Sequence, residues 1–220
     1  MRSVGESGEQ DGGSPQRRAL AAYLAMAKET PDWSRRLVML AAAKDAIPFA
    51  LAGVVAGAAV LWTCAEQGLL RESSVAGWID FQVTTLSEAV RILKNELRKG
   101  LPVSVGVLDA RGRVWPEAVE RGLQPQALLA GEAEQEAARI LLARGAERLQ
   151  MGPSVRLDAH VGETWRARKA ADEALLASAQ RLAGPERAVA MRWLRSVPRL
   201  FPRDTTRWYA AAWAASKDDR

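Results

Sequence analysis

The segment between residues 77 and 130 constrains the fold most, because the spacing of its apolar residues changes from strand to helix and back. Residues 79–83 alternate apolar and polar side chains, as in a strand with one buried face. Thr85 and Glu88 follow with the spacing of a capping box, which satisfies free backbone N–H groups at the start of a helix. Gly100 marks the end of that helix. The segment therefore predicts a strand that leads directly into an amphipathic helix.

The next apolar run, at residues 103–108, is nearly continuous and is typical of a strand that is covered on both faces. A strand–helix–strand unit of this kind is expected to be parallel and right-handed, because only that hand packs the helix back onto a twisted sheet. A short helix around Pro116, a third strand at 126–129 and a helix at 132–144 continue the alternation. The sequence predicts an α/β fold with a doubly wound, mostly parallel sheet.

The chain divides into three parts by local pattern. Residues 1–16 are polar and rich in glycine and serine, which predicts a flexible tail without the apolar core of a secretory signal. Residues 17–150 hold the α/β core, beginning with a helix that ends at Thr30, before a proline. Residues 151–220 are predicted to form a helical C-terminal region packed on that core. Its expected helices are 163–183, 185–196 and 204–215.

Residues 46–65 carry no charge and form a segment long enough to cross a bilayer. Gly53 and Gly57 also have the spacing of small residues in packed membrane helices. However, alanine and glycine gain little from lipid, and charged residues flank the segment closely. We therefore expect no membrane span but a helix buried against the sheet, where small residues let its backbone approach a strand.

Cys64 is the only cysteine of the 220 residues, so the chain can form no internal disulfide and no cysteine-based zinc site. This favours a reducing, cytoplasmic location. Because Cys64 falls within the expected buried helix, we predict an unreactive thiol in the core.

Two blocks of residues in the strand–helix–strand region share their order and spacing with a known family. The first block is Gly77-Trp78-Ile79-Asp80 followed by Leu86-Ser87-Glu88-Ala89-Val90. The second block is Ser104-Val105-Gly106, then Val114, Pro116-Glu117, Val119, Arg121-Gly122 and Pro125. Both blocks resemble the urocanase family, the urocanate hydratases of histidine breakdown. The resemblance implies a Rossmann-like core that in the family holds NAD⁺ tightly, and a homodimer.

The departures from the family pattern fall on the turns that would face the cofactor. Where the family has Gly-Asn-Ala directly after the strand, this chain has Asp109-Ala110-Arg111, which removes a glycine beside a phosphate and adds a repelling carboxylate. In the next turn, residues 129–137 carry Gly131 and three acids in place of the family's polar residues. Residues 53–57 contain glycines in a helical pattern, not in a dinucleotide-binding turn. We therefore expect no cofactor, and NAD⁺ only if the family site persists.

The candidate ligand-binding residues follow the carboxyl ends of predicted strands, where doubly wound sheets present their ligand contacts. They are Asp109, Arg111, Arg113 and Gly131. The alternative is that residues 109–113 form only a charged turn.

His160 is the only histidine, so any histidine-dependent acid–base step must use it, with Asp158 nearby in sequence. The alternative is a surface or capping residue, because His160 stands between a Gly-Pro loop and an expected helix start. No metal site is predicted, since Glu132, Glu134 and Glu136 do not share one helical face.

Tryptophan and arginine are frequent in the C-terminal region, and the net charge is +5, a combination that can indicate nucleic-acid binding. This chain disfavours it, because Pro198 and Pro202 interrupt any single basic helix and acids intervene. A helical cap on the sheet, or a dimer surface built from tryptophans, fits better. These tryptophans are Trp165, Trp193, Trp208 and Trp213.

The residues support three functional hypotheses. The first, which we favour, is a diverged urocanase-like domain without hydratase activity that binds a protein or a small ligand, as a homodimer. The second is an active hydratase or other lyase with a rebuilt site near Asp109, Arg111 and His160. The third is a basic protein that binds nucleic acid or an acidic partner. The first hypothesis is favoured because the scaffold residues of the family are kept while the turns that would face the cofactor are altered.

Overall fold

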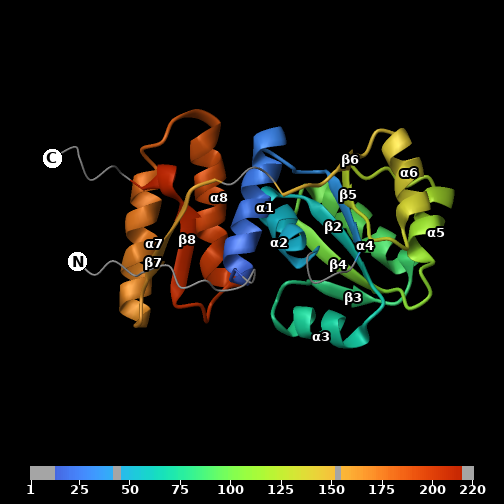
Figure 1. Cartoon of the computed structure of the whole chain (residues 1–220), viewed down its shortest axis with the longest axis horizontal. Helices are drawn as coiled ribbons and strands as arrows, with labels where there is room; N and C mark the ends of the chain where they lie inside the picture. The colour runs from blue at the N-terminus through green and yellow to red at the C-terminus, as the bar shows by residue number, and fades with distance from the viewer. Residues whose placement is uncertain (1–12, 42–45, 152–154, 215–220) are drawn as a thin grey trace.

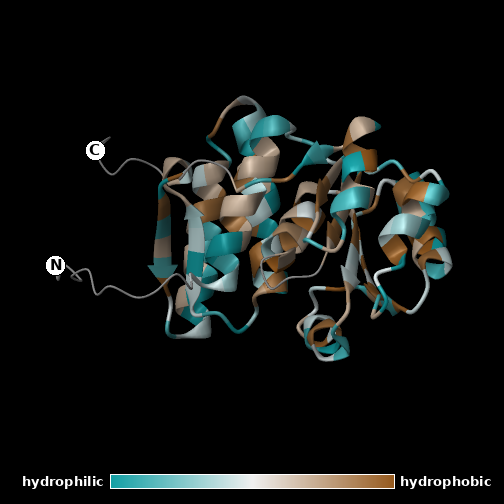
Figure 2. Cartoon of the chain, turned by 45° about the vertical axis from the view of Figure 1, so that its right-hand side comes forward, coloured by the Kyte–Doolittle hydropathy of each residue, from teal (hydrophilic) through white to brown (hydrophobic). Residues whose placement is uncertain are grey.

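The computed structural model describes residues 13–41, 46–151 and 155–214. Within this part of the chain, a six-stranded sheet with helices on both faces forms the larger body. A two-stranded sheet with its own helices lies beyond α1, at the end of the molecule opposite α5 and α6 (Figure 1). Hydrophobic residues concentrate on the strands of the large sheet and on the helix surfaces that cover it (Figure 2).

All strand pairs of the large sheet are parallel, in the order β3-β4-β2-β1-β5-β6. The strands are β1 (Leu37–Ala41), β2 (Ala59–Cys64), β3 (Phe81–Val83), β4 (Val103–Leu108), β5 (Ala127–Leu129) and β6 (Glu147–Arg148). The central strands β1 and β2 are buried along their whole length, which explains their unbroken apolar sequences. The predicted α/β fold with a doubly wound, parallel, Rossmann-like sheet is confirmed.

Two apolar cores lie on the two faces of this sheet. The helices that contribute to the first core are α1 (Pro15–Glu29), α2 (Ala46–Ala56), α3 (Gln67–Val75) and α8 (Gly184–Leu200), of which α8 packs on α1 and α2. The helices of the second face are α4 (Leu86–Lys99), α5 (Val114–Glu120) and α6 (Gln135–Ala143). Because α2 and α6 follow the neighbouring strands β1 and β5 but cover opposite faces, the winding direction changes between these two strands.

The β3–α4–β4 unit forms as its sequence predicts. The Thr85 hydroxyl accepts a hydrogen bond from the Glu88 backbone N–H at 3.3 Å, so α4 begins with the predicted cap. Gly100 ends α4 with a φ of 70°, a conformation that glycine adopts without strain. Local chemistry alone therefore sets both ends of this helix.

The expected single helix at residues 46–65 is wrong. The structure divides this segment into α2, a turn at Gly57 with a φ of 100°, and β2. Since both elements are buried nearly all round, neither shows a periodicity that separates helix from strand. The expected close approach is present, because a Cβ atom on Gly53 would lie 2.8 Å from a Val60 methyl carbon. No helix among the described residues is long and apolar enough to cross a membrane.

The first helix begins earlier than predicted. Ser14 caps α1 by accepting a hydrogen bond from the Arg17 N–H at 3.2 Å, and the helix starts at Pro15. Gln16, which the sequence placed in the flexible tail, is completely buried in α1. Residues 1–12 of that tail lie outside the described residues.

The C-terminal region is only partly helical. Of the three expected helices, two form, as α7 (Trp165–Ala179) and α8, and α8 continues through Pro198. The expected helix at 204–215 is wrong, because residues 206–210 form β8 (Thr206–Ala210) and a short 3₁₀ turn follows. β8 pairs antiparallel with β7 (Leu157–Val161), which the sequence did not predict. The partner of each strand lies far away in the sequence, so no hairpin signal marks either one.

The side chain of Gln16 closes the outer edge of β8. Its amide nitrogen donates to the Thr206 carbonyl at 3.1 Å, and its amide oxygen accepts from the Trp208 N–H at 2.6 Å. One amide side chain from α1 thus satisfies the two backbone groups that a neighbouring strand would satisfy. Nearby, the rings of Tyr23 and Trp193 stack with their centroids 5.8 Å apart, which joins α1 to α8.

We expect the Gln16→Ala substitution to lower the free energy of unfolding by about 1–3 kcal/mol, because two partly buried backbone groups lose their partner. Urea unfolding followed by circular dichroism measures this change. The matched control is Gln180→Ala at an exposed position, where the change should stay within about 0.5 kcal/mol. Equal effects of the two substitutions would contradict the role of Gln16.

Candidate functional site

A pocket of about 410 Å³ lies at the carboxyl edge of the large sheet, where β3 and β4 end. Parallel strands place their carboxyl ends at the same edge, so the turns that lead into α4 and α5 meet there. The pocket is lined by Thr84, Thr85, Leu86, Ser87, Leu108, Asp109, Ala110, Arg111, Arg113, Val114 and Glu117. Three of the predicted ligand-binding residues, Asp109, Arg111 and Arg113, are therefore brought together.

Asp109 caps the start of α5 with both of its carboxylate oxygens. One oxygen accepts from the Arg113 backbone N–H at 2.8 Å and the other from the Val114 N–H at 3.0 Å. Its own N–H donates to the Cys64 carbonyl at 2.7 Å, which fixes the turn on the end of β2. Gly112, with a φ of 62°, allows the chain to reverse inside this turn. Residues 109–113 thus form the charged turn that the sequence offered as the alternative.

The neighbouring turns also carry acids of the chain itself. At the start of α4, the Glu88 carboxylate lies 3.4 Å from the Thr85 hydroxyl that caps the helix. Before α6, the Gly131 N–H donates to the Glu134 carboxylate at 3.1 Å. Gly131 therefore belongs to a turn whose backbone donor is already used, and it does not line the pocket at Asp109.

Arg111 and Arg113 supply the positive charge at this pocket. Both side chains are exposed, and no ion pair among the described residues involves either guanidinium. The nearby Glu117 carboxylate pairs with Arg121 one turn later on α5. The two guanidiniums remain available to an anion, whereas the nearest carboxylates already have partners.

The structure does not bring His160 and Asp158 to this pocket. Both lie in β7, at the end of the molecule opposite α5 (Figure 1). His160 is exposed and stands in this strand across from Arg207, a few residues before α7. Among the described residues, no three His, Cys, Asp or Glu side chains gather as a metal ion would require.

Cys64 is buried at the carboxyl end of β2, not in the expected helix. Its thiol donates to the Glu66 carbonyl at 3.2 Å. Burial raises the pKa of this thiol, a hydrogen bond with the Glu66 backbone offsets part of the rise, and the Glu66 carboxylate adds to it. The protonated form is therefore favoured, which supports the predicted lack of reactivity.

A second pocket, of about 400 Å³, lies where the winding direction changes, between the carboxyl ends of β1 and β5. Its lining is mostly apolar and comprises Arg18, Pro48, Phe49, Leu129, Leu149, Gln150 and Met151. Sequence reasoning missed this pocket, because β2 was read as part of a helix and the strand order could not be derived. The strand order of the sheet is the feature that locates this pocket, because ligand crevices in such sheets lie where the winding direction changes.

The residues that the sequence shares with the urocanase family have structural roles in this core. The Asp80 carboxylate accepts from the Ser104 N–H at 2.8 Å and so ties the start of β3 to β4. Gly106 lets α3 pack closely on β4, since a Cβ atom there would lie 2.6 Å from a Leu70 methyl carbon. Asp80, Ser104 and Gly106 shape the scaffold and do not line the Asp109 pocket, whereas the shared residues Leu86, Ser87, Val114 and Glu117 do line it.

Residues 46–131 match the family model of the urocanase Rossmann-like domain. The match runs from α2 to the turn after β5, so it includes both turns that form the Asp109 pocket. The resemblance read from residues 77–130 is confirmed as a partial match to the central region, and it extends further towards the N-terminus than the sequence blocks did. The urocanase-like region leaves out α1, β1, α6, β6 and the whole C-terminal region.

We expect Asp109→Ala to destabilise the urocanase-like region by about 1–2 kcal/mol, because the first N–H groups of α5 lose their acceptor. Thermal and urea unfolding measure the loss. The exposed Glu120→Ala substitution on the same helix is the control, with an expected change within about 0.5 kcal/mol. An Asp109→Ala protein as stable as this control would show that the cap contributes nothing.

Proposed function

We propose that this protein is a diverged urocanase-like domain that lacks urocanate hydratase activity, does not hold NAD⁺, and binds a small anionic ligand at the carboxyl edge of its sheet. The observation that carries the proposal is the double cap of α5 by the Asp109 carboxylate. The match to the urocanase Rossmann-like domain supports the inherited scaffold.

The pyrophosphate of a dinucleotide does not fit the Asp109 turn. Phosphates in sheets of this kind accept hydrogen bonds from backbone N–H groups at the start of a helix. Here the N–H groups of Arg113 and Val114 already donate to Asp109. A phosphate in the same place would lack these donors and would meet a fixed carboxylate, at a cost of about 4 kcal/mol for unit charges 4 Å apart near a surface.

A smaller anion fits the same pocket through its side chains. The Arg111 and Arg113 guanidiniums can each bind a carboxylate or phosphate group through paired hydrogen bonds. The Thr84 and Ser87 hydroxyls line the opposite wall. The volume of about 410 Å³ lies in the lower part of the usual range for ligand pockets, about 300–1,000 Å³. These features support a ligand with one anionic group.

The other two hypotheses receive less support from the described residues. A rebuilt hydratase site needs His160 beside Asp109 and Arg111, but His160 stands in β7 at the far end. For nucleic-acid binding, Trp193 and Trp213 are buried and cannot stack on bases.

We expect the purified protein to contain no nucleotide and to consume no urocanate. Mass spectrometry of the denatured protein and the ultraviolet spectrum of the native protein test the first point, and an absorbance assay with urocanate tests the second. Added NAD⁺ should leave the melting temperature unchanged even at millimolar concentration, because only a ligand that binds the native state stabilises it. Stoichiometric NAD⁺ in the untreated protein would overturn the proposal.

We expect one or more small carboxylates or phosphates to raise the melting temperature of the wild type at millimolar concentration. The double substitution R111A/R113A should abolish this rise, since it removes both guanidiniums from the pocket. The matched control R91A/R98A removes two arginines from α4 outside the pocket and should keep the rise. A rise that survives R111A/R113A, or no rise with any ligand, would contradict the anion site.

A further inference from the structure

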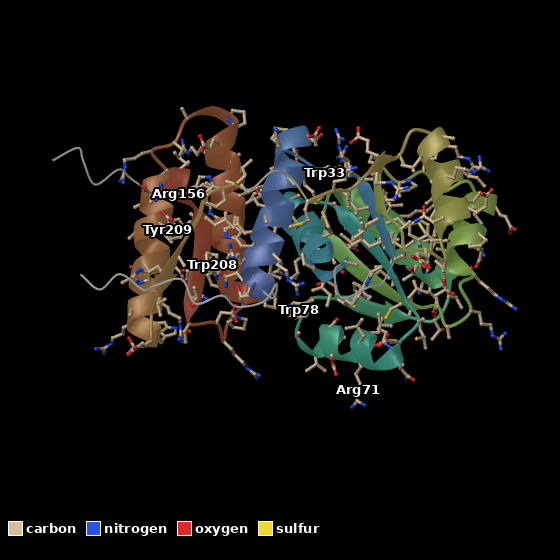
Figure 3. The ribbon with its side chains drawn as sticks, viewed as in Figure 1. Trp33, Arg71, Trp78, Arg156, Trp208 and Tyr209 are labelled. Atoms are coloured by element: carbon tan, nitrogen blue, oxygen red, sulfur yellow. The ribbon has the colours of Figure 1, made fainter. Side chains whose placement is uncertain are left out.

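The strand β7 has one edge without a neighbouring strand among the described residues. It pairs only with β8, and Gln16 closes the other edge of β8 (Figure 3, where Arg156, Trp208 and Tyr209 mark this small sheet). Unpaired N–H and C=O groups on a strand edge are ready to bond a further strand. Two strands alone are also fewer than an independently stable sheet usually needs.

The hydrogen bonds to β8 determine which β7 groups point outward. The Arg156 carbonyl accepts from the Ala211 N–H at 3.0 Å, and the Gly162 N–H donates to the Thr205 carbonyl at 2.8 Å. Because residues alternate in an antiparallel ladder, the even-numbered residues between these positions also face β8. The residues with outward backbone groups are Leu157, Ala159 and Val161.

We propose that two copies of this chain pair antiparallel through their β7 strands, about a two-fold axis at Ala159. In this register, Leu157 lies opposite Val161 of the second copy, and Ala159 lies opposite Ala159 of the second copy. Each outward N–H then meets an outward C=O, and the two small sheets become one sheet of four strands. The inference goes beyond the proposed ligand binding and does not depend on it.

Side-chain pairing favours this register over its neighbours. With the axis at Ala159, Asp158 lies opposite His160 of the second copy, in the closer type of antiparallel pair. The next registers in which the outward N–H and C=O groups match have the two-fold axis one residue away from Ala159. An axis at residue 158 places Asp158 opposite Asp158, and an axis at residue 160 places His160 opposite His160. Only the central register places an imidazole N–H donor of one copy opposite the Asp158 carboxylate of the other at both places.

Apolar contact adds to the backbone pairing. Leu157, Ala159 and Val161 share one face of β7, and Val161 is 64% exposed in the single chain. Trp165, 65% exposed, lies just beyond the end of the strand. A single strand pair buries less area than a standard interface, so we expect a dimer with a dissociation constant of about micromolar size.

The large sheet offers shorter edges for such pairing. Its outer strands are β3, with three residues, and β6, with two. β7, with five residues, is the longest strand with an unpaired edge among the described residues.

Sedimentation equilibrium of the full chain over a micromolar concentration series tests the proposal. We expect the wild type to dimerise, and Ala159→Pro to weaken the dimer by about tenfold or more, because it removes an outward donor and blocks the edge. The ladder to β8 does not use that N–H, and circular dichroism checks the fold. Val161→Lys should act similarly, whereas Val75→Lys, at an 84% exposed valine on α3, should leave the dimer unchanged.

Two further variants test the register. Ala159→Cys should form an interchain disulfide on mild oxidation, because the two Cα atoms would lie about 5.5 Å apart, within the range of disulfides. Val75→Cys is the control and should stay reduced, as should the buried Cys64. His160→Asp should weaken the dimer, and adding Asp158→Lys should restore it. A monomeric wild type, or a dimer unaffected by Ala159→Pro and Val161→Lys, would overturn the proposal.

Discussion

The parallel sheet places the carboxyl ends of its strands at one edge, so the unpaired N–H groups of the following helices also gather there. These donors need acceptors, and in a nucleotide-binding sheet the phosphates supply them. In this chain the acceptors come from the chain itself. Asp109 takes the first donors of α5, the Thr85 hydroxyl takes one of α4, and Glu134 takes the N–H of Gly131. The backbone donors at this edge therefore have acceptors without a ligand. The positive charge available to a ligand there belongs to the Arg111 and Arg113 side chains.

Hydrogen bonds from side chains to backbone groups also join the C-terminal region to the urocanase-like core. Gln16 completes the edge of β8, and Tyr23 donates to the Val189 carbonyl at 2.9 Å while its ring packs on Trp193. Arg192 reaches back to the Ala56 carbonyl at 2.8 Å, at the end of α2. α1 and α8 thus hold the two sheets together, although the first turn of α1 resembles a tail in sequence.

The sequence predicts the fold well wherever short-range chemistry decides it. The cap at Thr85 and the left-handed Gly100 mark α4 without reference to the rest of the chain. The sequence does not predict the fold where burial by distant parts of the chain determines the local structure. Residues 46–65 are uncharged and almost entirely apolar, and only Gly57 marks the break between α2 and β2. The candidate site follows the same rule. The cluster of Asp109, Arg111 and Arg113 could be found from one strand end, whereas the pocket beside β5 required the complete strand order.

The central claim is that Asp109 occupies the place of a phosphate. Calorimetric titration with NAD⁺ tests it most directly, on the wild type and on a variant in which Asp109-Ala110-Arg111 is changed to the Gly-Asn-Ala of the urocanase family. We expect no measurable binding by the wild type and a gain of affinity in the variant, because the backbone donors at the start of α5 become free. Binding of NAD⁺ by the wild type with an affinity equal to or greater than that of the variant would show that the Asp109 carboxylate does not exclude the cofactor.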